Sequence, residues 1–197
     1  PPRLWHISSE YVLGQGVVAR FDPETYSDAV AFARIGEGSL GGKARGLAFM
    51  NSMILKHRLY DKHANVRIMI PRSVVIATDY FDDFIRLNGL KYIISQEFSD
   101  EEILSEFVSS TVPAKLQQEL KAYIQTVRTP LAVRSSSKLE DSHYQPFAGI
   151  YSTYMIPYVD NGDQMLRLLL KAVKSVYASV YFATSRAYLS SSQNLIS

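Results

Sequence analysis

The chain has 197 residues, of which 47% are hydrophobic and 20% are charged, the composition of an ordinary globular protein. Its 21 basic and 19 acidic residues leave a net charge of +2, and the basic residues are scattered, which disfavours a nucleic-acid-binding function. No apolar run approaches the roughly 18 residues that a membrane span requires, and the lack of cysteine excludes disulfides and thiolate chemistry.

The two ends of the chain carry little that indicates chemistry. The chain begins at Pro1-Pro2, without an initiator methionine or a signal-peptide pattern, so we expect a piece of a longer protein. The absence of cysteine fits a reducing compartment, and we expect a cytoplasmic location. Residues 1–33 are rich in aromatic side chains but irregular, and we expect them to wrap the domain. Residues 190–197 have the composition of a linker.

The segment richest in glycine lies between Gly36 and Gly42 and holds four of the ten glycines of the chain. It runs directly into a helical pattern over 42–56. A glycine loop at a helix start leaves backbone N–H groups unpaired, and the helix dipole favours an anion there. Lys43, placed in the first turn against this dipole, indicates a phosphate ligand. A tight connection that uses glycine for positive φ fits the composition equally well. The apolar stripe of the helix comprises Ala44, Leu47, Ala48, Phe49, Met53 and Ile54.

This loop differs from two common nucleotide-binding motifs. A Walker A motif has glycine six residues before its lysine and Ser or Thr after it, and these positions hold Glu37 and Ala44. A dinucleotide fingerprint follows a strand, whereas no clear strand pattern precedes this loop, and the glycine spacing is also different.

Extended segments and a helix are predicted after the first helix. Residues 66–70 predict a short strand, and residues 73–77 predict a second one because they are rich in β-branched side chains. Thr78 or Asp79 can begin the next helix, and Gly89 ends it.

Three further helices are marked by their first residues or their periodicity. Ser99 and Glu102 form a capping box, in which each side chain bonds the backbone N–H of the other residue. Pro113 suits the first position of the following helix, where its missing N–H is not needed. Residues 163–189 carry apolar side chains at helical spacing and predict one long helix.

Strands alternate with these helices. Residues 131–133 predict a buried strand that ends at Arg134, and residues 150–156 predict another strand after a polar loop. The alternation, without internal repeats, favours an α/β class that tends towards α+β, with a mixed sheet flanked by helices.

Arg134 is a second candidate for binding an anion, because its guanidinium begins at the edge of the core. An unpaired buried cation costs several kcal/mol, so this side chain needs a partner. Glu140 or Asp141 could supply a structural ion pair, which we favour for Arg134 taken alone. The alternative is a bidentate contact with phosphate oxygens, with a hydroxyl donor from Ser135.

The turn from Gly149 to Thr153 is a third candidate. Small residues that open a strand can bring backbone N–H groups close to a ligand, and Thr153 adds a hydroxyl. Taken alone, this turn is more simply the edge of a hairpin. The four histidines show no metal-ligand spacing, and no Ser-His-Asp arrangement is visible.

Together these segments resemble the motifs of the phosphoenolpyruvate synthase and pyruvate phosphate dikinase family. The order and the approximate spacing hold from about residue 34 to residue 189. The segments that carry the resemblance are Gly41–Ala48, similar to GGKGANL; Ile70–Thr78, similar to VPPGFVIT; Ala132–Asp141, similar to AVRSSATAED; Phe147–Thr153, similar to FAGxxxT; and Lys174–Tyr188, similar to KxVWASLF…RAxAYR.

The resemblance implies an ATP-grasp-like nucleotide-binding domain over residues 34–189, the PEP/pyruvate-binding N-terminal region of such enzymes. These kinase-like transferases move the β-phosphate of ATP, through a histidine on a swivelling domain, to pyruvate or a related acceptor. ATP is therefore the implied ligand, while Mg²⁺ and pyruvate or PEP would be bound by downstream domains of the parent protein. The fragment would then be inactive alone.

The resemblance also implies roles for particular residues. Lys43 and Arg134 would contact the ATP phosphates and take part in catalysis, and the turn from Gly149 to Thr153 would cover the phosphates. No metal ligand is implied within this chain. The implied nucleotide-binding set comprises Gly41, Gly42, Lys43, Arg134, Ser135, Gly149 and Thr153.

Two departures from the family motifs support a different function. Arg45 replaces a small residue near the lysine, and Lys138-Leu139 stands where the family has a threonine that could bind phosphate. A non-catalytic nucleotide-sensing or regulatory module that retains the fold would tolerate both changes.

Overall fold

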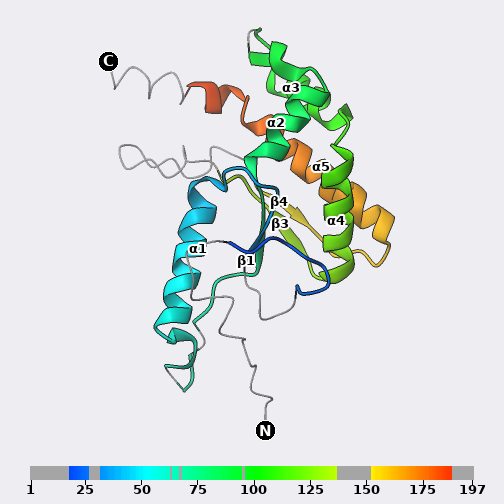
Figure 1. The fold of residues 1–197 in the computed structure, drawn as a ribbon. Coiled ribbons are helices and arrows are strands. Elements are labelled where there is room, and N and C mark those ends of the chain that lie inside the picture. The colour runs from blue at the N-terminus through cyan, green and yellow to red at the C-terminus, as the bar shows by residue number, and fades with distance from the viewer. Residues whose placement is uncertain are drawn as a thin grey trace, which may run out of the picture. The chain divides into compact units, whose positions relative to one another are not determined.

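The computed structural model describes residues 18–26, 32–62, 64–66, 68–94, 96–136 and 152–187. The chain divides into two compact units, Pro1–Thr78 and Asp79–Ser197. Each unit has a small sheet and packed helices (Figure 1). This confirms the predicted mixed α/β class with sheets flanked by helices.

The first unit is built on a β-α-β arrangement. Strand β1 (Phe32–Ile35) leads through the glycine loop into α1 (Gly41–Lys56), and the short 3-10 helix η2 (Leu59–Asp61) follows before β2 (Ser73–Ile76). The two strands are parallel, with Phe32 opposite Ser73 and Ile35 opposite Ile76. Parallel strands require a long crossover, which α1 provides here.

The inner face of α1 covers the core of this unit. Ala44 is buried with Phe32 from β1 and with Ile70, and Leu47, Ala48 and Ile54 pack against them. The prediction that Phe49 belongs to this stripe is wrong, because its side chain is 66% exposed. Phe49 follows Ala44 by five residues, which places it about 140° around the helix at 3.6 residues per turn.

Sequence patterns misplaced two extended segments of this unit. β1 was not predicted, although it directly precedes the glycine loop. The strand predicted over 66–70 is wrong for the described residues 68–70, which form no strand. On the side of β1 away from β2, the chain around Arg20 forms a parallel bridge with Arg34, and Phe21 N–H donates to the Arg34 carbonyl at 2.7 Å.

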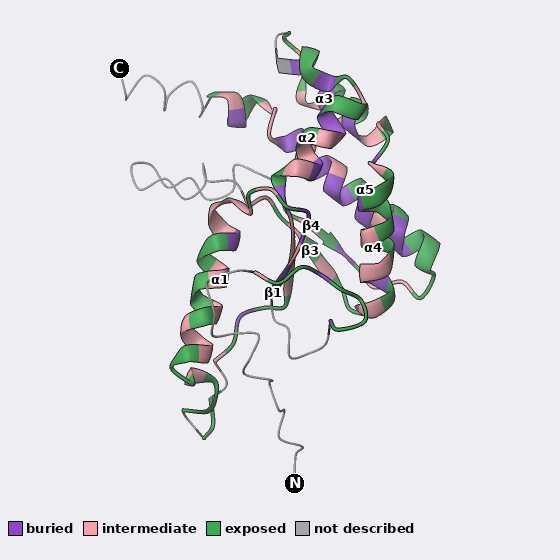
Figure 2. Cartoon of the chain, in the orientation of Figure 1, coloured by how far each residue is buried: buried purple, intermediate pink, exposed green. Residues whose placement is uncertain are grey.

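In the second unit, one long helix organises the others. α5 (Gly162–Ser179) packs against α3 (Asp100–Ser109), α4 (Ala114–Thr126) and both strands of an antiparallel pair, β3 (Leu131–Val133) and β4 (Tyr154–Ile156). Its inward face is buried (Figure 2). α2 (Thr78–Leu87) and the short 3-10 helix η3 (Leu90–Ile94) precede α3. Within the described residues, no helix is long and apolar enough to cross a membrane.

Aromatic rings form the centre of the second unit. Phe84 of α2 and Phe107 of α3 are fully buried, and their ring centroids lie 5.7 Å apart. Tyr177 of α5 lies 5.5 Å from Phe84, and its burial raises the pKa of its hydroxyl. The rings therefore join three helices through contacts that are separated widely in sequence.

Both ends of α3 are held by specific hydrogen bonds. The predicted capping box is confirmed: the Ser99 backbone N–H donates to the Glu102 carboxylate at 2.8 Å, and the Glu102 N–H donates to Ser99 Oγ at 3.2 Å. At the other end, Lys174 Nζ from α5 donates to the carbonyls of Val108 and Ser110. A cation suits these carbonyls because the C-terminal end of a helix carries partial negative charge.

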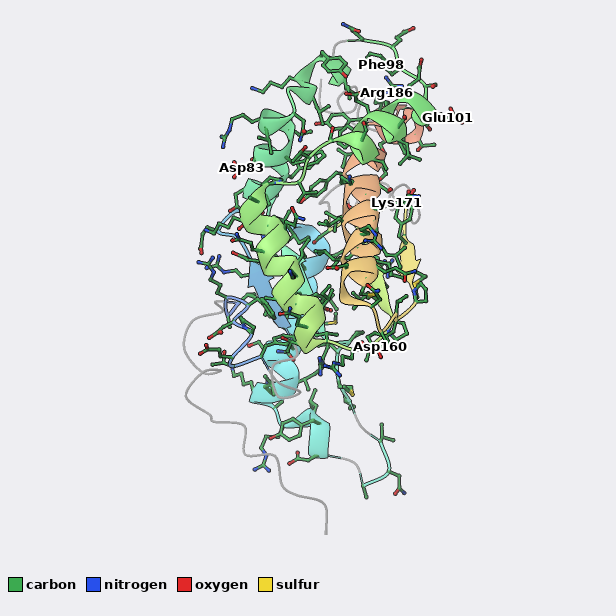
Figure 3. All side chains as sticks on the ribbon, turned by 90° about the vertical axis from the view of Figure 1, so that its right-hand side faces the viewer. Asp83, Phe98, Glu101, Asp160, Lys171 and Arg186 are labelled. Carbon is green, nitrogen blue, oxygen red and sulfur yellow. The ribbon has the colours of Figure 1, made fainter. Side chains whose placement is uncertain are left out.

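The helix predicted over 163–189 is interrupted. α5 ends at Ser179, and a new helical turn covers 183–187. Ser185 Oγ donates to the Ser179 carbonyl at 2.7 Å, and Ala183 N–H donates to Asp100 Oδ1 at 2.8 Å. Arg186 then donates to the Phe98 carbonyl at 3.1 Å, beside the start of α3 (Figure 3). These tertiary bonds outweigh the local helical preference of the segment.

Smaller differences concern the other predicted ends. Pro113 was predicted at the first position of α4, but the helix begins at Ala114 and Pro113 is its N-cap residue. β4 begins at Tyr154, so residues 152–153 of the strand predicted over 150–156 are not part of it, and 150–151 lie outside the described residues. The helix over 42–56 and the helix end at Gly89 agree with the structure, and the strand predicted over 73–77 ends one residue earlier, at Ile76.

We expect Glu102→Ala to destabilise the fold in a pH-dependent way. Hydrogen bonds from the Ser99 backbone and hydroxyl hold the pKa of Glu102 below its ordinary value of 4.5. A carboxyl with a lowered folded pKa stabilises the fold above its unfolded pKa, and this contribution is lost as the pH falls through the folded value. The difference in thermal unfolding temperature between wild type and variant should therefore shrink below pH 4.5. A difference independent of pH would contradict this role of Glu102.

We expect Lys174→Met to lower the free energy of unfolding by about 1–3 kcal/mol, because two carbonyls at the end of α3 lose a charged donor. Lys171→Met is the matched control, since Lys171 is exposed on the same helix (Figure 3). Its effect should stay within about 0.5 kcal/mol. Urea denaturation of both variants measures the difference, and equal effects would show that the Lys174 bonds do not stabilise the fold.

Candidate functional site

The glycine loop, residues 36–40, connects the end of β1 to the start of α1. In parallel α/β structures, ligands bind beyond the carboxyl ends of the strands, where such loops lie. Gly36 has φ of 93° and Gly41 has φ of 78°, values that side chains rarely permit. Glycine is therefore required at both ends of the loop, as the conformational explanation of its composition predicted.

A set of charged side chains holds the first half of this loop. Arg34 of β1 donates to the Gly36 carbonyl and forms an ion pair of 2.6 Å with Glu37, while its Nε donates to the Val18 carbonyl at 3.2 Å. Arg20 approaches the other oxygen of Glu37 at 3.4 Å. The Glu37 carboxylate thus joins the loop to two neighbouring extended segments.

A second set, which is mostly hydroxyl-based, holds the other half. Ser39 N–H donates to Thr78 Oγ1 at 3.0 Å, and Thr78 N–H donates back to the Ser39 carbonyl at 3.0 Å. Ser39 Oγ in turn accepts from Arg45 at 3.0 Å and from Gly41 N–H at 3.4 Å. Ser39 therefore links the glycine loop both to the start of α2 and to the first turns of α1.

The charge around this loop is positive. Lys43 is half-buried in the first turn of α1, a turn that contains no acidic residue. Arg45 lies two residues further along the same helix, and Arg34 of β1 donates to the Gly36 carbonyl of the loop. Glu37 is the acid within the loop. With the positive end of the α1 dipole, these cations make the loop attractive to an anion.

Two other predicted residues meet at the end of the antiparallel strand pair. Val133 is opposite Tyr154, so Arg134 after β3 and Thr153 before β4 flank the same end of the sheet. Both side chains are exposed, and Ser135 beside them is half-buried. Arg134 was expected at the edge of a buried strand, but β3 is only partly covered, with Ala132 exposed.

The structure thus sorts the predicted residues into two groups. Gly41, Gly42 and Lys43 lie together in the first unit, and Arg134, Ser135 and Thr153 lie together in the second. Gly149 lies outside the described residues, as do Glu140 and Asp141, the acids considered as partners of Arg134.

Sequence reasoning missed the side chains that hold the loop. Arg34 and Ser39 were not singled out, Glu37 was noted only as a departure from the Walker A motif, and Thr78 was considered as a helix cap and as the end of a family-like segment. The missing information was β1: once that strand is parallel to β2, Ser39 and Thr78 follow neighbouring strand ends. The apolar residues Phe32 and Ala33 next to the glycines were a usable signal for it.

A Mg²⁺ site does not emerge from the described residues. No three His, Asp or Glu side chains among them are placed to hold a metal ion together. Glu37, the acid in the glycine loop, is bound by two arginines. We therefore assign none of the described residues to the metal.

Comparison with known proteins identifies the family. Residues 37–195 match the family model described as pyruvate phosphate dikinase, AMP/ATP-binding domain. The match takes in the glycine loop from Glu37 onward, together with Lys43, Arg134 and Thr153. No curated protein and no solved structure matches the chain. Because the family model covers most of the sequence, the chain belongs to the pyruvate phosphate dikinase AMP/ATP-binding domain family.

Proposed function

We propose that the chain is the ATP-binding portion of a phosphotransferase similar to PEP synthase or pyruvate phosphate dikinase. The observation that carries this proposal is the glycine loop: a loop held at both halves and flanked by the cations Arg34, Lys43 and Arg45, at the start of the segment that matches an AMP/ATP-binding family. The nucleotide-binding part would be residues 34–189, with residues 1–33 as a wrapping segment and residues 190–197 as a linker.

In this proposal the protein acts mainly by binding and orienting phosphate groups. Lys43 contributes a point charge, and the Gly42 N–H contributes a donor at the positive end of α1, beside Gly41, whose own N–H donates to Ser39 Oγ. Arg134 offers a planar guanidinium that can bind two phosphate oxygens at once, with Ser135 and Thr153 as hydroxyl donors. Fixed donors of this kind stabilise the charge that develops during phosphoryl transfer.

The remaining parts of the reaction are proposed to come from outside these residues. The phosphoryl group would pass to a histidine on another domain and then to pyruvate or a related acceptor. Mg²⁺ would screen the phosphate charge when bound. This chain alone would bind ATP without turning it over, and we expect it to act in the cytoplasm.

Arg45 bears on the rival function, a nucleotide-sensing module without catalysis. It stands where the family has a small residue, and this departure was one of the two reasons for considering such a module. In the structure the Arg45 guanidinium binds Ser39 Oγ and so helps to hold the loop. This contact gives Arg45 a structural role that an active enzyme can also use, so turnover must decide between the two functions.

We expect Lys43→Ala and Arg134→Ala each to weaken ATP binding by the chain roughly 10- to 100-fold, the loss of one charged hydrogen bond. Isothermal titration calorimetry with ATP at constant ionic strength measures the affinity.

Two matched controls separate site effects from general charge effects. Lys56→Ala removes an exposed cation from the last turn of α1, and Arg128→Ala removes an exposed cation before β3. Both controls should bind ATP like the wild type. If the Lys43 and Arg134 variants also bind like the wild type, the site assignment is wrong.

In the full-length protein, we expect ATP, pyruvate and water to give AMP, PEP and phosphate, and Lys43→Ala to reduce this turnover strongly. Lys56→Ala again serves as the control. ATP binding without any turnover by the full-length wild type would favour the nucleotide-sensing module. The released AMP and phosphate are measured directly, so the two functions give different results.

A further inference from the structure

Thr78 and the glycine loop are joined by a reciprocal pair of hydrogen bonds between residues far apart in sequence. Ala77 N–H donates to the Ile35 carbonyl at 2.9 Å, which continues the pairing of β1 with β2 by one step. Thr78 then donates its N–H to the Ser39 carbonyl and accepts the Ser39 N–H on its Oγ1, both at 3.0 Å. The side chain of Thr78 therefore adds a bond that the backbone of a strand could not make.

This bond is the first in a short series that reaches the start of α1. Ser39, fixed by Thr78, accepts from Gly41 N–H and from the Arg45 guanidinium on its Oγ. Leu40, the cap residue of α1, has no side-chain hydrogen bond of its own to the helix start. The first turn of α1, which carries Lys43, is thus oriented through Ser39 and ultimately through Thr78.

We propose that Thr78 is a positioning residue for phosphate binding: it fixes the glycine loop so that the first turn of α1 is ready for a polyphosphate. The proposal rests on the proposed function, since it names a further residue of the same site. The hydroxyl acts through Ser39 and not by touching the ligand. A loop that is ordered in advance binds more tightly, because the ligand does not have to offset the entropy of ordering it.

The chemistry of Thr78 allows a clean pair of substitutions. Thr78→Val keeps the branched shape and the backbone N–H but removes the oxygen that accepts from Ser39. Thr78→Ser keeps this oxygen and removes only a methyl group. Ser73→Ala is the matched control, because Ser73 lies at the opposite end of β2 and its hydroxyl bonds only locally, to the Pro71 carbonyl at 3.0 Å.

The test is a titration of the ¹⁵N-labelled 197-residue chain with tripolyphosphate, followed by the amide signals of Gly41 and Gly42. Tripolyphosphate is the probe because it carries the phosphate groups without adenine. In the wild type these signals should shift with saturation. Thr78→Val should raise the dissociation constant roughly 3- to 10-fold, the effect of one hydrogen bond, and Thr78→Ser and Ser73→Ala should match the wild type.

Lys43→Ala in the same titration distinguishes the two ways in which the idea can fail. If Lys43→Ala loses tripolyphosphate binding while Thr78→Val binds like the wild type, the positioning role of Thr78 is overturned and the proposed function stands. If the wild type does not bind, or if Lys43→Ala binds equally well, both are overturned. A thermal unfolding curve for each variant confirms that binding is compared between folded chains. If Thr78→Ser binds tripolyphosphate as weakly as Thr78→Val, the role of the hydroxyl is also overturned.

Discussion

The parallel pairing of β1 with β2 is the constraint on which the first unit depends. It sets Ile35 opposite Ile76, so the two chains leave the sheet at the same end. The glycine loop and Thr78 are neighbours for this reason alone, although α1 and a long connection separate them in sequence. Without that register, the hydrogen bonds between Ser39 and Thr78 would not exist, and the start of α1 would lose its link to the end of β2.

The glycine loop combines a high glycine content, which favours flexibility, with hydrogen bonds and ion pairs that hold both of its halves. It is rich in glycine, which raises the entropy lost on folding, yet it is fixed by bonds at both halves. Glu37 and Arg34 hold the first half with charge, and Ser39 and Thr78 hold the second with neutral hydrogen bonds. The positive φ angles explain why glycine is needed there, and the surrounding cations explain why the fixed loop suits an anion.

Two cations in the family-like segment Lys174–Tyr188 stabilise the fold by binding backbone carbonyls around α3. Lys174 begins the segment that resembles a family motif, but in the structure it binds the carbonyls at the end of α3. Arg186, further along, binds the Phe98 carbonyl near the start of the same helix. Both cations therefore stabilise the packing of the second unit, where burial lowers the pKa of Lys174.

The sequence by itself determined the fold class, the helix at 42–56, the capping box at Ser99 and the family, because each depends on local periodicity or on motif order. It also pointed to the loop with Lys43. Only the tertiary structure decided that β1 exists, that the helix after 163 breaks at Ser179, and that Ser39, Arg45 and Thr78 belong together. These features depend on partners far away in the chain, and a pattern of neighbouring residues carries no information about which strand end lies beside which.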